Sequence, residues 1–342
     1  MLGIELGRIR LAVPLVLIGI AVFALVLQQF WPILTGRFVH EPGDLGFSDF
    51  EKVDDYPLYV MRLEGDYGFS EYLLTGVLSF TFRQPTSPSC TCFAALGEGG
   101  PAIFGRNFDF PQNPALLLYT DPPDGYASVS MVNLGYFGYS MSNLPDPDGG
   151  LGALGWTPYL PFDGMNEHGL AVSMAAIPYA ESPHDLEKLT IGEIQVIRLL
   201  LDRARDVEEA LWIIEEYNVR IETPPVHYLL ADRSGGSAIV EFVGGEMRVL
   251  RDDEPWQVMT NFIVVDSGAP EVVSCSRYRS VYDGLNDADG SVSMEGAMSL
   301  LEGTSQSSTI WSCVYNMETG EVHVAMGGEY TQVLSFQAPR TP

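Results

Sequence analysis

A cysteine and an arginine sixteen residues apart are the pair best suited to chemistry in this sequence. Two apolar runs, 90–96 and 102–109, flank a Gly-rich break, as in two short strands joined by a turn. If this hairpin folds about Glu98, antiparallel pairing brings Arg106 opposite Cys90, at roughly 5 Å. A guanidinium beside a thiol lowers its pKa and favours the thiolate, which is the nucleophilic form. The alternative interpretation is a buried hairpin whose cysteines act only as small hydrophobic residues.

The arginine belongs to a Gly-Arg-Asn-Phe-Asp motif at 105–109, which ends nineteen positions after Cys90. This order and spacing resemble the start of the mature N-terminal nucleophile (Ntn) hydrolases of the choloylglycine hydrolase group, which are linear amide C–N hydrolases. The group includes bile salt hydrolases, penicillin V acylase, acid ceramidase and N-acylethanolamine acid amidase, with isopenicillin N acyltransferases as more distant relatives. Cys92 does not fit the pattern. Further matching motifs lie, in chain order, at 164–170, 238–241, 260–261, 276–278 and 309–315.

The resemblance covers residues 90 to about 330 and implies a nucleophile that is also its own base. A free α-amino group has a pKa of about 8, so it can take the thiol proton and later give it to the leaving amine. This chemistry requires that the Ser89–Cys90 bond be cut, by attack of the Cys90 thiol on the preceding carbonyl. The mature enzyme would then attack an amide, release the amine and hydrolyse an acyl thioester.

The same resemblance implies the other four site residues. Arg106 would favour the thiolate, unless it forms only a surface salt bridge, and Asp109 would hold the new α-ammonium, unless it caps a turn. Asn261 would offer its side-chain amide to the oxyanion. Arg277 would orient this cluster, with Arg279 as a rival for that role.

One position departs from the bile salt hydrolase pattern. In those enzymes a second Asn lies ten residues beyond the position of Asn166, and here that residue is Ala176. The Ala176 N–H could still serve an oxyanion, but a side-chain contact to the substrate is lost, so the sequence disfavours bile salts. The anchor, the long segment before Cys90 and the short distance from Asn261 to Arg277 resemble acid ceramidase and its amidase relative. Asn166 and His168 are expected to support a turn.

The chain begins with a segment suited to a membrane. Residues 11–36 carry no charge and follow Arg8 and Arg10, which predicts an uncleaved transmembrane signal anchor over 1–36. A cleaved signal peptide and a buried core helix are the alternatives. The catalytic domain would then lie outside the cytoplasm, membrane-anchored or secreted after processing.

Beyond the anchor, we predict a propeptide-like segment at 37–89 and an Ntn hydrolase domain at 90–342. The segment 37–89 contains a strand at 56–63 and ends in an exposed loop at 83–89. Pro- and Gly-rich loops are expected over 111–159. The aromatic candidates for an apolar acyl pocket, with plain core as the alternative, are Phe108, Phe110, Tyr136, Phe137, Tyr139 and Trp156. The remaining elements are helices at 190–217, broken before a capping Asp206, and at 294–301, with strands at 228–231, 238–242, 247–250, 257–260, 310–315 and 322–326. Strands at both ends with helices between them indicate an α+β fold, the four-layer αββα sandwich that the resemblance also implies.

The net charge and the number of cysteines exclude several classes of protein. A net charge of −27, from 45 acidic and 18 basic residues, repels nucleic acid, so nucleic acid is not an expected partner. Four scattered cysteines do not make a disulfide framework, and no second Cys/His cluster has metal-ligand spacing. We therefore expect no metal and no cofactor, a small-molecule N-acyl amide as partner, and membrane contact through the N-terminal helix. The oligomeric state stays open.

The sequence thus predicts a cysteine amidohydrolase acting on N-acyl compounds with an apolar acyl group. An acyltransferase of the isopenicillin N type is an alternative, because pocket shape and water exclusion choose the acceptor. A membrane-tethered binding or redox protein that never matures is the other.

Overall fold

The computed structural model describes residues 45–75, 89–146, 148, 152–222, 224–267 and 274–341. All of them lie in one of the two compact units of the chain, that of residues 42–76 and 82–342. Within these ranges, none of the helices is long and apolar enough to cross a membrane. The predicted anchor at 1–36 lies outside the described residues and stays a prediction, as does the loop predicted up to residue 88.

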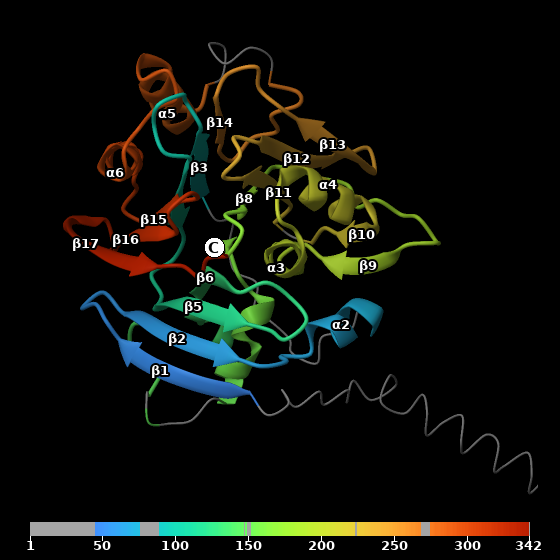
Figure 1. Cartoon of the computed structure of the whole chain (residues 1–342), viewed down its shortest axis with the longest axis vertical. Coiled ribbons are helices and arrows are strands. Elements are labelled where there is room, and N and C mark those ends of the chain that lie inside the picture. The colour runs from blue at the N-terminus through green and yellow to red at the C-terminus, as the bar shows by residue number, and fades with distance from the viewer. Residues whose placement is uncertain are drawn as a thin grey trace, which may run out of the picture. The chain divides into compact units, whose positions relative to one another are not determined.

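Six strands form one antiparallel sheet, in the order β14-β3-β4-β15-β16-β17 (Figure 1). The elements on this side are β3 (Ser89–Ala95), β4 (Ile103–Asp109), β14 (Trp256–Met259), α5 (Ser276–Asp287), α6 (Met294–Gly303), β15 (Thr309–Asn316), β16 (Glu321–Met326) and β17 (Glu329–Gln337). Val281 of α5 and Leu301 of α6 are buried with Phe93 and Val314 of the strands. The two helices therefore cover one face of this sheet.

Nine strands form the second sheet, in the order β1-β2-β5-β6-β7-β8-β11-β12-β13. Its strands are β1 (Gly46–Lys52), β2 (Leu58–Glu64), β5 (Ala115–Asp121), β6 (Ser128–Asn133), β7 (Asp163–Asn166), β8 (Ala171–Ala176), β11 (Val226–Ala231), β12 (Ser237–Val243) and β13 (Glu246–Leu250). The smaller elements are α2 (Phe69–Thr75), the 3₁₀ helices η1 (Leu134–Phe137) and η2 (Gly152–Tyr159), β9 (Leu189–Gly192), α3 (Gln195–Arg203), α4 (Val207–Glu215) and β10 (Tyr217–Arg220). β1 and β2 precede Cys90, and β2 pairs in parallel with β5 along its whole length. Part of the segment predicted to be propeptide-like is therefore built into this sheet.

The two sheets pack face to face, with β3 against β8 and β11. Asp163 of β7 points towards the six-stranded sheet, where it meets Arg106. The next residue, Gly164, faces Leu201 of α3 on the other side, since neighbouring strand residues point to opposite faces. The layers are thus helices, sheet, sheet and helices, the αββα arrangement that the sequence predicted.

The hairpin of β3 and β4 has a different register from the predicted one. Cys92, not Cys90, lies opposite Arg106, and Cys90 lies opposite Phe108. The hairpin folds one residue later than expected, at Gly99, whose φ of 80° favours glycine. Each residue therefore pairs with a partner two positions away from the predicted one, and residues two positions apart on a strand point to the same face of the sheet. Arg106 therefore still points to the side of the sheet on which Cys90 lies.

The helices after residue 190 follow the prediction closely. α3 and α4 are separated as expected, and the Asp206 side chain caps α4 by accepting a hydrogen bond from Glu209 N. The predicted start of the first helix, at residue 190, was wrong, because residues 189–192 form the strand β9. α5 and β17 were not predicted, since the amino acids of both are largely polar and many are exposed.

The loops predicted over 111–159 were also wrong in part. Residues 115–121 and 128–133 are the strands β5 and β6, and their side chains are nearly all buried. Strands covered on both faces read as continuous apolar runs without the polar alternation that marks a half-exposed strand. The Pro and Gly residues around them obscured the run at 115–118.

Candidate active site

Cys90 lies near the start of β3 between the two sheets, and 1% of its surface is exposed. Its Sγ accepts a hydrogen bond from Nη2 of Arg106, at 3.4 Å. Arg106 projects from the middle of β4 and is fully buried. The predicted meeting of thiol and guanidinium therefore occurs, along a diagonal of the hairpin.

The Arg106 guanidinium also binds an acid that the sequence analysis did not single out. Its Nη1 donates to Oδ2 of Asp163, at 2.9 Å, and to the backbone carbonyl of Phe162. Trp311 Nε1 and the Tyr315 hydroxyl donate to the same carboxylate. Asp163 immediately precedes the motif at 164–170, but nothing in its own surroundings in the sequence marks it.

The thiol is not activated in this uncleaved chain. Burial raises the pKa of Cys90, and the positive charge of Arg106 opposes that effect without reversing it. Burial likewise raises the pKa of Asp163, with Arg106 opposing it. The charge of the guanidinium is thus shared between a carboxylate and the sulfur. Burial therefore favours the neutral thiol of Cys90 in the uncleaved chain.

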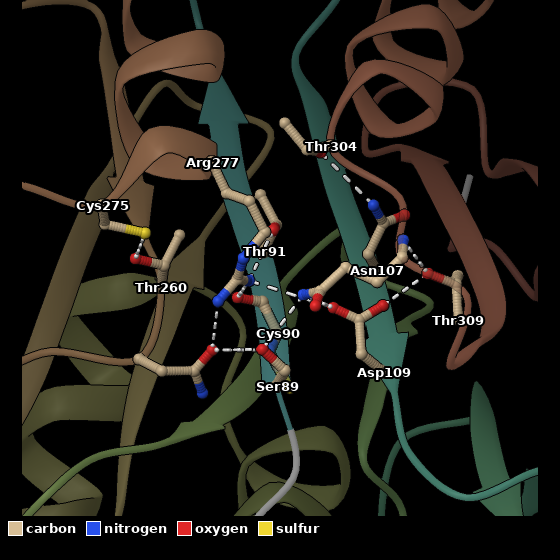
Figure 2. Close-up of polar contacts among 12 residues, drawn as sticks. Ser89, Cys90, Thr91, Asn107, Asp109, Thr260, Cys275, Arg277, Thr304 and Thr309 are labelled. Carbon is tan, nitrogen blue, oxygen red and sulfur yellow. Dashed lines mark hydrogen bonds and ion pairs between the residues drawn. The ribbon is translucent and has the colours of Figure 1, made fainter.

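Arg277 reaches this strand from the first turn of α5 (Figure 2). Its Nη1 donates to the backbone carbonyl of Cys90 and to Thr91 Oγ1, at 3.0 Å. Its Nη2 donates to Asn261 Oδ1, at 2.9 Å. Arg279 is exposed, so Arg277 is the arginine that contacts the cluster.

Asn261 follows β14 by two residues and contacts both the strand and the second sheet. Its Oδ1 accepts the Cys90 N–H, at 2.7 Å, and its Nδ2 donates to the carbonyl of Ala176, at 2.8 Å. The Ala176 backbone and the Asn261 amide, the two groups considered for an oxyanion, are therefore neighbours.

Asp109 ends β4 and lies opposite Ser89, one position before the nucleophile. Thr309 Oγ1 donates to its Oδ1, at 2.5 Å, and Gln306 Nε2 donates to its Oδ2, at 2.9 Å. Arg277 Nη1 lies 3.9 Å from the same carboxylate. Burial raises the pKa of Asp109, and Thr309 and Arg277 oppose that effect. The carboxylate is thus held beside the place where an α-ammonium would form.

Ser89, the residue before the predicted cut, is partly buried, whereas Cys90 is buried. Ser89 Oγ is 3.1 Å from Gln306 Nε2 and 3.4 Å from Asn261 Oδ1. Figure 2 shows Ser89 and Asp109 at adjacent strand ends. The residue before the predicted cut is therefore held by the same groups that surround the nucleophile.

Several aromatic rings pack against one another next to Arg106. Its guanidinium lies 4.9 Å from the ring of Phe108, which stacks on Trp311 at 4.1 Å and on Phe110 at 5.5 Å. Tyr136 packs against Phe110, at 6.0 Å. Three of the predicted pocket aromatics, at 108, 110 and 136, are thus together beside the thiol, whereas Trp156 packs on Tyr159.

The structure brings together all five predicted site residues: Cys90, Arg106, Asp109, Asn261 and Arg277. The sequence analysis missed the roles of Asp163, Gln306 and Thr309. Asn166 accepts hydrogen bonds from the N–H groups of His168 and Leu170, which is the turn role expected for it. In the part of the chain that the structure describes, no three His, Cys, Asp or Glu side chains are grouped to hold a metal ion.

The two packed sheets with helices on their outer faces define the class of fold, that of the Ntn hydrolases. Penicillin V acylase from Agrobacterium tumefaciens superposes with a TM-score of 0.54 at 19% identity, over 72% of this chain and 86% of that one. A variant of the conjugated bile acid hydrolase from Clostridium perfringens gives 0.52 at 17% identity, over 72% and 92%. Residues 90–263 match the family of linear amide C–N hydrolases, choloylglycine hydrolase family. This chain belongs to that family.

Two curated relatives are similar in sequence. Penicillin V acylase from Pectobacterium atrosepticum is 24% identical over 204 residues, 54% of this chain and 52% of the relative. An uncharacterized protein of Paramecium bursaria Chlorella virus 1 is 29% identical over 182 residues, 50% of this chain and 55% of the relative. The chain therefore spans about half the length of the curated relatives that it matches.

Proposed function

We propose that this protein hydrolyses linear amides of N-acyl compounds, with Cys90 as an N-terminal nucleophile. The observation that carries the proposal is the set of contacts on this one residue. Its sulfur meets Arg106 at 3.4 Å, and its N–H meets Asn261 at 2.7 Å. Membership of the linear amide C–N hydrolase family supports the reaction class.

The first step would be cleavage of the chain itself. The Cys90 sulfur attacks the Ser89 carbonyl carbon, the C–N bond to Cys90 breaks, and the thiol proton passes to the new amine. Water then hydrolyses the Ser89 thioester, giving a carboxylate on Ser89 and a free thiol. The α-amine that is released lies on the same residue as the sulfur and supplies the base that the buried thiol lacks.

In turnover, the α-amine takes the thiol proton and the sulfur attacks the substrate carbonyl. Asn261 Nδ2 and the Ala176 N–H would stabilise the oxyanion, and Asp109 would hold the α-ammonium. The ammonium returns a proton to the leaving amine, and water cleaves the acyl thioester. Arg277 would keep Asn261 and the Cys90 backbone in place through the contacts already described.

The acyl group is proposed to be apolar and flat enough to lie on the rings beside Arg106. Phe110, which is buried like Phe108, and the half-buried Tyr136 continue this row of rings. Two proteins similar to this chain are named for penicillin V and for conjugated bile acids. Ala176 in place of an asparagine disfavours conjugated bile acids as the substrate.

After cleavage, the N-terminal piece is proposed to stay bound, because β2 pairs with β5 along seven residues. We also keep the proposals that 1–36 is a signal anchor and that the catalytic domain lies outside the cytoplasm.

N-terminal sequencing of the purified protein tests the proposal most directly. We expect a new N-terminus at Cys90, a co-purifying N-terminal fragment, and release of amine from phenoxymethylpenicillin or an N-acyl aryl amide. Adding hydroxylamine as a competing acceptor measures acyl transfer against hydrolysis. A chain that stays intact and cleaves neither substrate would overturn the proposal.

A further inference from the structure

A buried histidine and glutamate lie behind the site, and the chemistry proposed above uses neither. His227 is on β11 and Glu241 is on β12, and both side chains are fully buried. His227 Nδ1 lies 2.9 Å from Glu241 Oε1, and its Nε2 lies 2.7 Å from the carbonyl oxygen of Thr260. A carbonyl can only accept, so Nε2 carries a proton towards Thr260.

The glutamate is ionised and holds the chain that follows Asn261. Oε1 accepts the N–H of Val264, at 2.7 Å, and Oε2 accepts the N–H of Val265, at 3.0 Å. Burial raises the pKa of Glu241, but these hydrogen bonds and that of His227 together bring it below its ordinary value. The two nitrogens of the His227 ring thus contact Glu241 on one side and the Thr260 carbonyl on the other.

The position of this pair matters because strand β14 ends before Asn261. Pairing between β14 and β3 ends at Met259, which lies opposite Cys92. Thr260 and Asn261 come after that last pair. The His227–Glu241 pair therefore fixes the backbone on both sides of Asn261, at residue 260 and at 264–265.

We propose that His227 and Glu241 are positioning residues that aim the Asn261 amide at the reacting carbonyl. The inference rests on the proposed function, in which Asn261 serves the oxyanion. An oxyanion donor works only if it is held in place before the charge develops. Freeing the Thr260 carbonyl would let residue 261 shift, and a shift of about 1 Å in a catalytic group costs up to about 100-fold in rate.

Two substitutions at one position separate this role from simple packing. His227→Gln places an amide nitrogen near the former Nε2 and keeps a donor for Thr260, whereas His227→Asn keeps only a donor near Nδ1, for Glu241. We expect His227→Asn to lower kcat by about 10- to 100-fold with KM nearly unchanged, and His227→Gln to stay within about fivefold of the native enzyme. His323 on β16, which pairs with Glu321 at 2.8 Å, supplies the matched control through His323→Asn and His323→Gln.

Hydrogen exchange of the peptide covering 260–265 gives a readout that needs no activity. Exchange should be faster in His227→Asn than in His227→Gln, while both lose similar thermal stability. Equal kcat in the two variants of an active enzyme, or a loss that simply follows melting temperature, would overturn this inference and leave the proposed function standing. A native protein without amidase activity would overturn the proposed function, and with it the catalytic part of this inference. Should His227→Asn not fold, an unchanged kcat in Glu241→Gln would overturn the inference in its place.

Discussion

Two buried arginine–aspartate pairs occupy the described part of this molecule, and only one of them contacts a cysteine. Arg106 lies 2.9 Å from Asp163, and Arg198 lies 2.6 Å from Asp202. All four side chains are at most 3% exposed. In each pair a tyrosine hydroxyl also donates to the aspartate. The ingredients of the two pairs are thus nearly the same.

The difference lies in how each guanidinium is used. Arg106 splits its two terminal nitrogens, with Nη1 on Asp163 and Nη2 on the sulfur of Cys90. Arg198 uses Nη2 for both Asp202 and Ser128, and its Nε and Nη1 have no hydrogen-bond partner among the described residues. A buried ion pair alone therefore does not mark a site. What distinguishes this one is an arginine that contacts both an acid and the sulfur of a cysteine.

Of the substitutions that distinguish the two pairs, Cys90→Ala should have the largest effect on activity, because only the Arg106–Asp163 pair contacts this cysteine. Without the sulfur there is no attack on the Ser89 carbonyl and none on a substrate, so we expect no cleavage and a loss of at least about 1,000-fold in activity. Sequencing the N-terminus and measuring amine release check both parts. Folding should be retained, because the Arg106–Asp163 pair does not depend on the thiol. Cleavage at Ser89–Cys90 in this variant would contradict the assignment of the nucleophile.

Replacing each arginine by methionine sharpens the comparison further. Arg106→Met and Arg198→Met each leave a buried aspartate without its cation, which should lower the free energy of unfolding by about 3–5 kcal/mol in both variants. Only Arg106→Met should also lower kcat, by about 100-fold or more, because only Arg106 contacts the sulfur.

Urea unfolding and single-turnover rates, expressed per folded molecule, give the two quantities separately. Arg106→Lys retains the charge but cannot reach two partners as a planar fork does. It should recover part of the stability and little of the rate. Equal rate losses at positions 106 and 198 would mean that the two pairs do not differ in function.

The sequence could predict the face on which Arg106 lies but not its exact partner. Strand parity follows from the period of two, so a register error of two residues left the side of the sheet correct. Local motifs also located Asn261 and Arg277, which lie sixteen residues apart and meet at 2.9 Å. Elements with a clear apolar period, such as α3, were placed well for the same local reason.

The contacts that could not be predicted from the sequence are those between residues far apart along the chain. Thr309 is 200 residues from the Asp109 that it binds, and Asp163 is 57 residues from Arg106. Pairing of β4 with β15 brings Thr309 to Asp109, and packing of one sheet on the other brings Asp163 to Arg106. From the sequence alone, Asp202, which lies beside Arg198, could not be distinguished from Asp163 as a candidate site residue.

The effect of a third buried acid, Glu193, on stability should depend on pH. Glu193 lies between β9 and α3, is 7% exposed, and burial raises its pKa from 4.5 to about 7. Because the folded state holds the proton more tightly, its contribution is present below about pH 4.5 and is lost as the pH rises through 7. That loss is on the order of 3 kcal/mol. Glu193→Gln should therefore raise the free energy of unfolding, relative to the native protein, more at pH 8 than at pH 4.5.

Urea titrations at the two pH values measure this difference. The exposed Glu302→Gln is the matched control and should show no comparable change between them. A Glu193→Gln effect that is the same at both pH values would mean that burial does not hold a proton on this residue.

Cys92→Ala should have the smallest effect, although Cys92 lies directly opposite Arg106. Cys92 shares a face of β3 with Cys90, but burial raises the pKa of its thiol to about 12. Its N–H belongs to the interior of a strand, so no cut can turn it into a free amine beside the sulfur. We expect cleavage and kcat to stay within about twofold, with a loss of about 1 kcal/mol in stability from the small cavity. If kcat fell as far as in Cys90→Ala, proximity to Arg106 alone would define the nucleophile, and the requirement for an α-amine on the same residue would be wrong.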